Sequence, residues 1–536
     1  MADSKATQET VTLTIDGQEV TVPKGTTILQ AAESMGTRVP HYCYHPGLTA
    51  PAQCRLCLVE VQGAPKLQAS CVTAAQDGQV VLTESEQATE MRQGVLEFYL
   101  ANHPLDCPIC DQSGECKLQD YVHAEGRKHG RSREPKRVFG RDDFGGDILF
   151  YGDRCVMCTR CVRFMEEKAQ DPRLTVVERG NRSIIDTFFE DGVEGSPYAG
   201  NIVDICPVGA LVSKDFLHKA RAWDLDHTPS ICPNCSQGCN IDLHVRDNRV
   251  QRIKPRANLS VNEYWMCDYG RHRYEWMNRE DRLEAPAYKV GGEYVITDWS
   301  SVLDELAERL DDPRPALAVA SPFASTEELG ALRRLVDHLG GGRIVYRMPR
   351  ADEEIPLPGF SDLARRRDLA PNGKGAEILG MERVGDDEGR GGLEDFSGHT
   401  GTLIVLGDEL ADLDQGFGEQ ASLYMYLGAH PSPAARQADF LLPRCTFAEQ
   451  EGTFINHQGR VQRFWPGIQA TGAAQPAWIA LAALQLRLEG GGRGISTAAE
   501  AFLQVAEVAP ELQGLSYQTI GTRGALVNEP VALPGS

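Results

Sequence analysis

The sequence predicts a multidomain protein in which α+β domains precede an α/β domain. At 536 residues the chain is too long for one ordinary domain. Fifteen of its sixteen cysteines fall into four groups before residue 268, and such groups indicate metal binding. Beyond them, short apolar runs alternate with helical patterns, as in a doubly wound parallel sheet. We expect four parts, which are residues 1–90, 91–222, 223–287 and 288–536.

The first part begins with a predicted hairpin and a short helix. Residues 9–22 alternate apolar and polar side chains on both sides of Asp16-Gly17, a pair typical of a tight hairpin turn. A threonine is placed to cap a helix over residues 27–35, which Gly36 ends. The first cysteine group follows and consists of Cys43, Cys54, Cys57 and Cys71.

Hairpin, helix and cysteine loop together resemble the β-grasp fold of plant-type [2Fe-2S] ferredoxins. Those proteins have four residues between the first two cysteines, whereas this loop has ten. The ferredoxin-like head of the large iron-sulfur subunit of respiratory NADH:quinone oxidoreductase has the longer loop, and this resemblance implies a [2Fe-2S] cluster. A structural zinc site is the alternative. We do not expect disulfides, because the N-terminus lacks a basic region followed by an apolar one and therefore predicts no export.

The second group lies beyond a predicted helix. Met91, Val95 and Phe98 have helical spacing, which predicts a helix over residues 86–101. Pro104 forces the preceding residue out of the helical conformation, as expected of a turning ligand loop. The group is His103, Cys107, Cys110 and Cys116. Three thiolates and an imidazole can bind zinc as well as iron. The pattern is similar to a site of the same family of large iron-sulfur subunits and of [FeFe] hydrogenases, which implies a [4Fe-4S] cluster.

The third group has the spacing of bacterial ferredoxins, in which a remote Cys-Pro completes a Cys-x2-Cys-x2-Cys run. Its members are Cys155, Cys158, Cys161 and Cys206. Because the chain has one such run, the resemblance implies one [4Fe-4S] cluster. Arg160 and Arg163 lie beside it in the sequence, where positive charge favours the reduced state.

The fourth group belongs to a small module that resembles the N-terminal [4Fe-4S] module of molybdopterin oxidoreductases. After its three closely spaced cysteines, apolar residues alternate with polar ones. The resemblance implies a third [4Fe-4S] cluster on Cys232, Cys235, Cys239 and Cys267.

The last part contains the pattern of a doubly wound sheet. Residues 438–462 again resemble a segment of molybdopterin enzymes. The expected elements are strands over 315–320, 343–346 and 402–406, helices over 326–339 and 477–488, and an acidic loop over 384–398.

We expect no molybdopterin. Cys445 is the only cysteine after the fourth group, and it lies where the resemblance does not place a metal ligand. The lysine that bridges cluster and pterin is absent from Asp268-Tyr269-Gly270. The 74 residues after Gln462 are too few for the domain that closes over the pterin. No further cysteine group exists for the active-site cluster of an [FeFe] hydrogenase.

Charge and hydropathy limit the partners. A net charge of -22 and a pI near 5.1 argue against nucleic acid. No stretch reaches the roughly twenty apolar residues that span a bilayer, so we expect no direct membrane insertion. The basic run over residues 127–141 is expected to be a surface loop, either solvated or docked on an acidic partner.

The four motifs occur in the order found in the large iron-sulfur subunits of bacterial NADH:quinone oxidoreductase, respiratory complex I. This resemblance implies electron transfer from the NADH/FMN side through the first, third and second groups toward quinone, with the fourth group off this path. It implies no catalytic acid, base or nucleophile in this chain. The implied partners are the NADH/FMN-binding subunit, the thioredoxin-like 2Fe-2S subunit and the quinone-side hydrophilic subunits, at the cytoplasmic face of the inner membrane. The alternatives are an electron-relay or pterin subunit of an NAD-linked formate dehydrogenase or hydrogenase, and a zinc-stapled scaffold.

Overall fold

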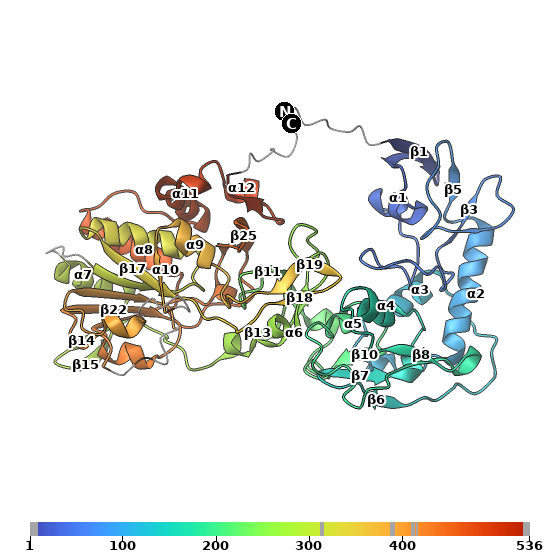
Figure 1. The fold of residues 1–536 in the computed structure, drawn as a ribbon, viewed down its shortest axis with the longest axis horizontal. Helices are drawn as coiled ribbons and strands as arrows, with labels where there is room; N and C mark the ends of the chain where they lie inside the picture. The colour runs from blue at the N-terminus through green and yellow to red at the C-terminus, as the bar shows by residue number, and fades with distance from the viewer. Residues whose placement is uncertain (1–8, 311–315, 386–391, 409–412, 414–415, 529–536) are drawn as a thin grey trace. The chain divides into compact units, whose positions relative to one another are not determined.

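The computed structural model describes residues 9–310, 316–385, 392–408, 413 and 416–528. The chain forms two compact units (Figure 1). The first unit comprises Met1–Asp224 and Pro358–Phe360, and the second comprises Leu225–Leu357 and Ser361–Ser536. Within the described ranges, no helix combines the length and the hydropathy needed to traverse a bilayer.

The first unit opens with the predicted hairpin. Strand β1 (Thr10–Ile15) pairs antiparallel with β2 (Gln18–Pro23), and the turn residues Asp16 and Gly17 both have positive φ, 48° and 83°. These strands belong to a five-stranded sheet in the order β2-β1-β5-β3-β4. Helix α1 (Ile28–Ser34) packs its apolar side chains into the same core as the sheet. The other strands are β3 (Leu58–Val61), β4 (Gln68–Ala69) and β5 (Val80–Leu82).

The helix predicted before the second group is present as α2 (Glu86–Asn102), but its apolar stripe is not the buried face. Met91 is 45% exposed and Phe98 is 82% exposed. The buried face carries Ala88, Arg92 and Leu96. Arg92 is buried there because its guanidinium pairs with Glu125 and donates to the Thr83 carbonyl at 2.6 Å.

Short elements make up the rest of the first unit. The basic run 127–141 is mainly an exposed loop before β6, as predicted, and Arg131 in it pairs with Glu97 of α2 at 2.7 Å. The helices are η1 (Cys107–Ile109), α3 (Lys117–Glu125), η2 (Gly152–Arg154), α4 (Arg160–Glu167), η3 (Gly180–Arg182), α5 (Asn201–Asp204) and η4 (Ala222–Asp224). The strands are β6 (Arg141–Asp143), β7 (Ile148–Tyr151), β8 (Thr175–Val177), β9 (Ile184–Asp186) and β10 (Leu211–Ser213).

The second unit starts with a three-stranded antiparallel sheet, β11-β12-β13, that carries the predicted alternating residues. Its strands are β11 (Asp226–Ile231), β12 (Asn240–Arg246) and β13 (Arg249–Pro255). Two short helices follow, α6 (Asp268–His272) and η5 (Glu275–Asn278).

An eight-stranded sheet in the order β15-β14-β23-β22-β21-β16-β17-β20 forms the body of this unit. The six strands from β23 to β20 are parallel, and β14 and β15 are antiparallel at one edge. Along the chain β16, β17 and β20 extend the sheet in one direction, and β21, β22 and β23 extend it in the other. The predicted doubly wound topology is therefore confirmed, with its switch point between β16 and β21. The strands are β14 (Ala287–Val290), β15 (Glu293–Ile296), β16 (Ala316–Ala320), β17 (Gly342–Arg347), β20 (Glu382–Val384), β21 (Thr402–Leu406), β22 (Leu423–Gly428) and β23 (Phe440–Pro443).

Both faces of the central strands are buried. In β16 the side chains of Ala316, Ala318 and Ala320 enter one core, and those of Leu317 and Val319 enter the other. Such strands read as continuous apolar runs, which is why the sequence revealed them. Pro315 and residues 386–391 of the predicted acidic loop lie outside the described residues.

Helices pack on the first of these cores, among them α8 and α10, which match the predicted helices within one residue. The helices are α7 (Trp299–Arg309), α8 (Thr326–His338), α9 (Gly373–Ile378), η6 (Leu393–Phe396), η7 (Pro433–Gln437), η8 (Phe447–Glu449), α10 (Ala477–Leu488), α11 (Ala498–Val508), η9 (Pro510–Leu512) and α12 (Tyr517–Ile520). The remaining strands are β18 (Ile355–Leu357), β19 (Phe360–Arg365), β24 (Gly452–Ile455), β25 (Arg460–Phe464) and β26 (Ala525–Leu526).

Candidate iron-sulfur centres

The structure brings the four thiols of the first group together. Cys43 hydrogen-bonds to Cys54 and Cys71, and Cys71 also hydrogen-bonds to Cys57. All four residues are buried. The bonds from the Cys54 and Cys71 thiols lower the pKa of Cys43, and the bond from Cys71 lowers the pKa of Cys57 to about 7. The same bonds raise the pKa of Cys54 and Cys71, which donate the protons. Four crowded thiols that share protons in this way fit a group that binds metal as thiolates.

Two loops hold non-glycine residues in the left-handed region. Ala52 and Arg55 flank Cys54 with φ of 55° and 59°, and Met157 and Thr159 flank Cys158 with φ of 50° and 57°. Such conformations cost about 1–3 kcal/mol each and persist where the surrounding structure requires them. Backbone amides also donate to sulfurs of these groups. The Tyr42 amide donates to Cys54 Sγ at 3.5 Å, and the Met157 amide donates to Cys155 Sγ at 3.3 Å. Amide donors of this kind tune iron-sulfur centres.

The thiols of the third group line one pocket. Cys155, Cys158, Cys161 and Cys206 share it with apolar side chains that include Phe150 and Ile185. Burial raises the pKa of each thiol, in the case of Cys206 to about 12. Metal binding at this group must therefore displace the thiol protons.

Two buried arginines of α4 connect the first and third groups. Arg163 donates to the carbonyl oxygen of Cys43 at 2.6 Å and to that of Cys158 at 3.2 Å. Arg160 donates to the Tyr44 carbonyl and, at 3.0 Å, to the Ile205 carbonyl. One guanidinium thus contacts the main chain of a cysteine in each of the two groups.

The second group follows α2 directly. His103 is the C-cap of this helix, and burial lowers the pKa of its ring, which keeps the imidazole neutral near pH 7. Its Nδ1 is buried and has no hydrogen-bond partner among the described residues. A neutral imidazole with a free nitrogen is the form that binds metal. Cys110 and Cys116 are buried, Cys107 is half-buried, and burial raises the pKa of Cys116 to about 11.

Arg154 connects this group to the third. It precedes Cys155 and donates to Asp106 Oδ2 at 2.6 and 3.1 Å and to the Gly209 carbonyl at 3.4 Å. Gly209 approaches Cys110 so closely that a Cβ there would lie 2.3 Å from the sulfur. The Lys117 amide, next to Cys116, also donates to the carbonyl of Pro207 at 3.0 Å.

The fourth group lies in the second unit, in the loop after β11 and at the start of α6. Burial raises the pKa of all four thiols. The pKa of Cys239 is raised further by negative charge on the three other cysteines of the group. The Gly270 amide donates to Cys267 Sγ at 3.4 Å. A Cβ at Gly270 would lie 2.9 Å from Cys232 Sγ, so only glycine allows this approach to the sulfurs.

Cys445 is separate from the four groups. It is buried after β23, and burial together with Glu449 and Glu328 raises its pKa to about 12. Among the described residues, no three His, Cys, Asp or Glu side chains form a site for a metal ion.

Five family profiles match successive stretches of the chain. They are a 2Fe-2S iron-sulfur cluster binding domain (residues 8–86), an NADH-ubiquinone oxidoreductase-G iron-sulfur binding region (92–131), an NADH-quinone oxidoreductase subunit 3 ferredoxin-like domain (145–212), a molybdopterin oxidoreductase Fe4S4 domain (225–279) and a molybdopterin oxidoreductase domain (374–487). The chain therefore contains 2Fe-2S and 4Fe-4S binding domains followed by a molybdopterin-oxidoreductase-like domain.

Curated proteins with known names share much of this sequence. The NADH-quinone oxidoreductase G subunit of Rickettsia conorii is 38% identical over 333 residues, which are 62% of this chain and 49% of that protein. The NADH-ubiquinone oxidoreductase 75 kDa subunit of Reclinomonas americana is 40% identical over 337 residues, which are 62% and 48%. The chain is a homologue of the NADH-quinone oxidoreductase G subunit. It spans about half the length of the curated relatives that it matches.

A solved structure is also similar in sequence. It is a chain of the NAD+-reducing [NiFe]-hydrogenase in the H2-reduced state, 31% identical, and the match covers 39% of this chain and 90% of that chain with a TM-score of 0.36.

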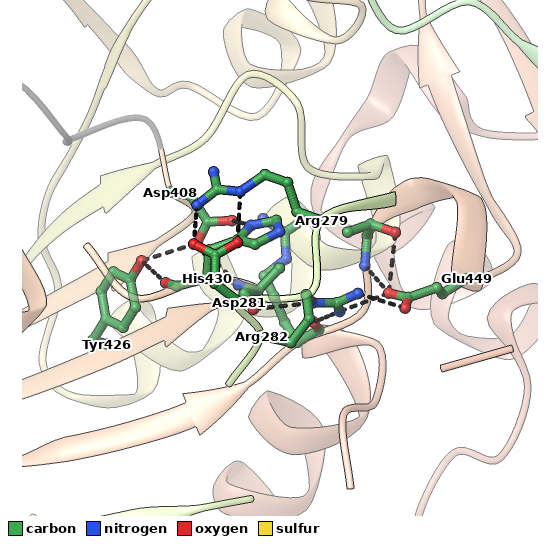
Figure 2. Close-up of polar contacts among 10 residues, drawn as sticks. Arg279, Asp281, Arg282, Asp408, Tyr426, His430 and Glu449 are labelled. Atoms are coloured by element: carbon green, nitrogen blue, oxygen red, sulfur yellow. Dashed lines mark hydrogen bonds and ion pairs between the residues drawn. The ribbon is translucent and has the colours of Figure 1, made fainter. Parts of the chain in front are cut away.

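The sequence placed Arg160 and Arg163 beside the third group but did not reveal their contacts with the first group. It also did not reveal the role of Arg154 or a polar cluster at the sheet edge of the second unit (Figure 2). The arginine contacts join positions far apart in the sequence, 120 residues in the Arg163 bond to Cys43 and 48 in the Arg154 bond to Asp106. The sheet-edge residues Asp408, His430 and Arg444 each follow a different parallel strand. Their position directly after apolar runs was the signal that could have found them.

Proposed function

We propose that this chain is the iron-sulfur electron-transfer subunit of a proton-pumping NADH:quinone oxidoreductase. In this proposal the first group holds a [2Fe-2S] cluster and each of the other groups holds a [4Fe-4S] cluster, with the ligands predicted from the sequence. The clusters supply one-electron transfer when bound, and hydride and quinone chemistry belong to partner subunits. The homologues with this name and the succession of matched domains support the proposal.

The observation that carries the proposal is the set of contacts in the first unit. Arg163 joins the first group to the third, and Arg154 joins the third group to the second. The first group also contacts the second, since the Tyr99 hydroxyl of α2 donates to the Cys54 carbonyl at 3.4 Å. The three groups of this unit are therefore neighbours. An electron-relay subunit needs neighbouring centres, whereas a zinc-stapled scaffold does not require its sites to be in contact.

The proposed partners are the NADH/FMN-binding subunit, the thioredoxin-like 2Fe-2S subunit and the quinone-side hydrophilic subunits. We place the chain in the peripheral arm at the cytoplasmic face of the inner membrane. We further propose that it binds no molybdopterin, since the bridging lysine is absent and the thiol of Cys445 is held protonated by burial.

The test replaces one proposed ligand of the third group in the assembled complex. Cys158→Ala should abolish electron flow from NADH to quinone, while reduction of ferricyanide at the flavin end continues. Cys445→Ala is the matched control, because it removes a buried cysteine outside the groups, and it should retain quinone activity. Full quinone activity in a Cys158→Ala complex that spectroscopy shows to lack this cluster would refute the proposal.

A further inference from the structure

Tyr42 is a buried tyrosine whose hydroxyl group has no hydrogen-bond partner among the described residues. The residue is 0% exposed, and it directly precedes Cys43 of the first group. An unpaired hydroxyl that is removed from water costs free energy, and buried polar atoms in native proteins are nearly always paired. The hydroxyl therefore indicates a partner that the chain itself does not supply.

The ring of Tyr42 packs against both helices that flank the second group. It meets the ring of Tyr99, in α2, edge-on at 5.2 Å, and the tilted ring of Tyr121, in α3, at 5.5 Å. Helix α2 is followed directly by His103, and α3 starts directly after Cys116. The backbone of Tyr42 thus belongs to the loop of the first group, whereas its side chain contacts the elements that carry the second.

The two neighbouring tyrosines differ from Tyr42 because their hydroxyl groups have acceptors on the chain. Tyr99 donates to the carbonyl oxygen of Cys54 at 3.4 Å, and Tyr121 donates to that of His41 at 3.3 Å. These bonds hold both rings in place, and the two rings hold Tyr42 in one position. Of the three phenols, only that of Tyr42 lacks an acceptor within the described part of the chain.

The surrounding charges indicate which group the hydroxyl approaches. Burial raises the pKa of the Tyr42 phenol, and negative charge on the adjacent tyrosines, on Cys116 and on Cys54 raises it further. Of the two cysteines, Cys116 has the larger effect, although the main-chain amide of Tyr42 donates to Cys54 Sγ. The phenol is therefore a protonated donor that lies toward the sulfur of the second group.

The second group contains another buried atom without a partner, which is Nδ1 of His103. An imidazole nitrogen with a free electron pair binds metal, and a phenol hydroxyl donates to an anionic acceptor. A [4Fe-4S] cluster provides iron for the first and negatively charged sulfur for the second. One occupant of this group therefore satisfies both atoms.

We propose that the Tyr42 hydroxyl donates a hydrogen bond to a sulfur atom of the cluster on the second group, and that this bond raises the reduction potential of that cluster. The inference rests on the proposed function, because it requires an iron-sulfur cluster at this group. The positive end of the O–H dipole stabilises the reduced state, which carries one more negative charge, and hydrogen bonds to sulfur are among the features that set such potentials. A residue from the loop of the first group thereby tunes the second.

The test is Tyr42→Phe in the assembled complex. This change removes the hydroxyl, keeps the ring and breaks no hydrogen bond to a described residue, so the variant is expected to fold. Redox titration followed by electron paramagnetic resonance should show the equilibrium constant for reduction of the second cluster lowered about tenfold, which is a downward shift of about 59 mV for a one-electron couple. The potential of the first cluster should remain that of the wild type.

A second measurement detects the bond itself. Electron-nuclear double resonance of the reduced second cluster, recorded in water and in deuterium oxide, should show an exchangeable proton in the wild type that is missing from Tyr42→Phe. Tyr121→Phe is the matched control, since it removes a buried hydroxyl from the same set of rings, and the bond of that hydroxyl goes to the His41 carbonyl. It should keep both the wild-type potential of the second cluster and the exchangeable proton.

The inference is overturned if Tyr42→Phe leaves the potential of the second cluster unchanged or shifts that of the first cluster instead. It is also overturned if the wild type shows no exchangeable proton, or if the variant retains it. A wild-type complex without any iron-sulfur signal from the second group would refute the proposed function as well. A normal signal with an unchanged potential refutes this inference alone.

Discussion

Arg163 offers a sharp test of the contact between the first and third groups. Its guanidinium touches the carbonyl of Cys43 and the carbonyl of Cys158, so its charge acts on both proposed clusters. Positive charge stabilises the reduced, more negative state of a cluster. Arg163→Gln keeps an amide that can donate to one carbonyl and removes the charge, and it should lower both reduction potentials.

The size of the shift follows from Coulomb's law. A unit charge about 8 Å from a redox centre, in an effective dielectric constant of about 20, interacts with it by about 2 kcal/mol. For a one-electron couple this corresponds to a downward shift of roughly 90 mV. A charge on the protein surface is screened by solvent and salt and should contribute much less.

Redox titration of the assembled complex, followed by electron paramagnetic resonance of both clusters, measures this shift. Arg182→Gln is the matched control, because Arg182 is an exposed arginine of the same unit, and its potentials should stay within error of the wild type. A shift of one potential alone, or of neither, would show that Arg163 does not couple the two groups.

Three other substitutions test other parts of the chain. His103→Cys should retain a [4Fe-4S] cluster and lower its reduction potential, since a thiolate adds negative charge where imidazole adds none. An unchanged potential would show that His103 is not a ligand. Cys235→Ala should lower the yield or melting temperature of the complex, because metal binding contributes to folding. The complexes that do assemble should turn over at nearly the normal rate per flavin. Slow turnover would place the fourth cluster on the main path. Burial raises the pKa of Glu327 from 4.5 to about 7, so its contribution to stability is complete below pH 4.5 and is lost as the pH rises to 7. Urea unfolding at pH 5 and pH 7.5 should show a loss of about 2 kcal/mol in the wild type that Glu327→Gln removes, and equal pH dependence in both proteins would contradict this.

The sequence predicted the local elements well because their patterns are local. The hairpin around Asp16-Gly17, helix α10 and strand β21 each carry their signal within one element. The sequence did not show which face of α2 is exposed, because burial of Arg92 depends on Glu125, a residue of another helix. Periodicity reports which residues share a face, and the tertiary partner decides which face is buried.

The cysteine spacing predicted which thiols form a group, and that each group binds a cluster remains a prediction. The contacts between the groups were outside the reach of spacing, since buried arginines such as Arg163 and Arg154 make the connections. The polar cluster at the sheet edge was missed for a similar reason. Asp408, His430 and Arg444 look like ordinary loop residues until the parallel strands bring their carboxyl ends together.

The central claim is that the four groups hold iron-sulfur clusters. Analysis of iron, acid-labile sulfide and zinc in the anaerobically purified chain tests it most directly. One [2Fe-2S] and three [4Fe-4S] clusters predict a brown protein with about fourteen irons per chain, a similar amount of sulfide and little zinc. A colourless protein that contains zinc in place of iron would contradict the account.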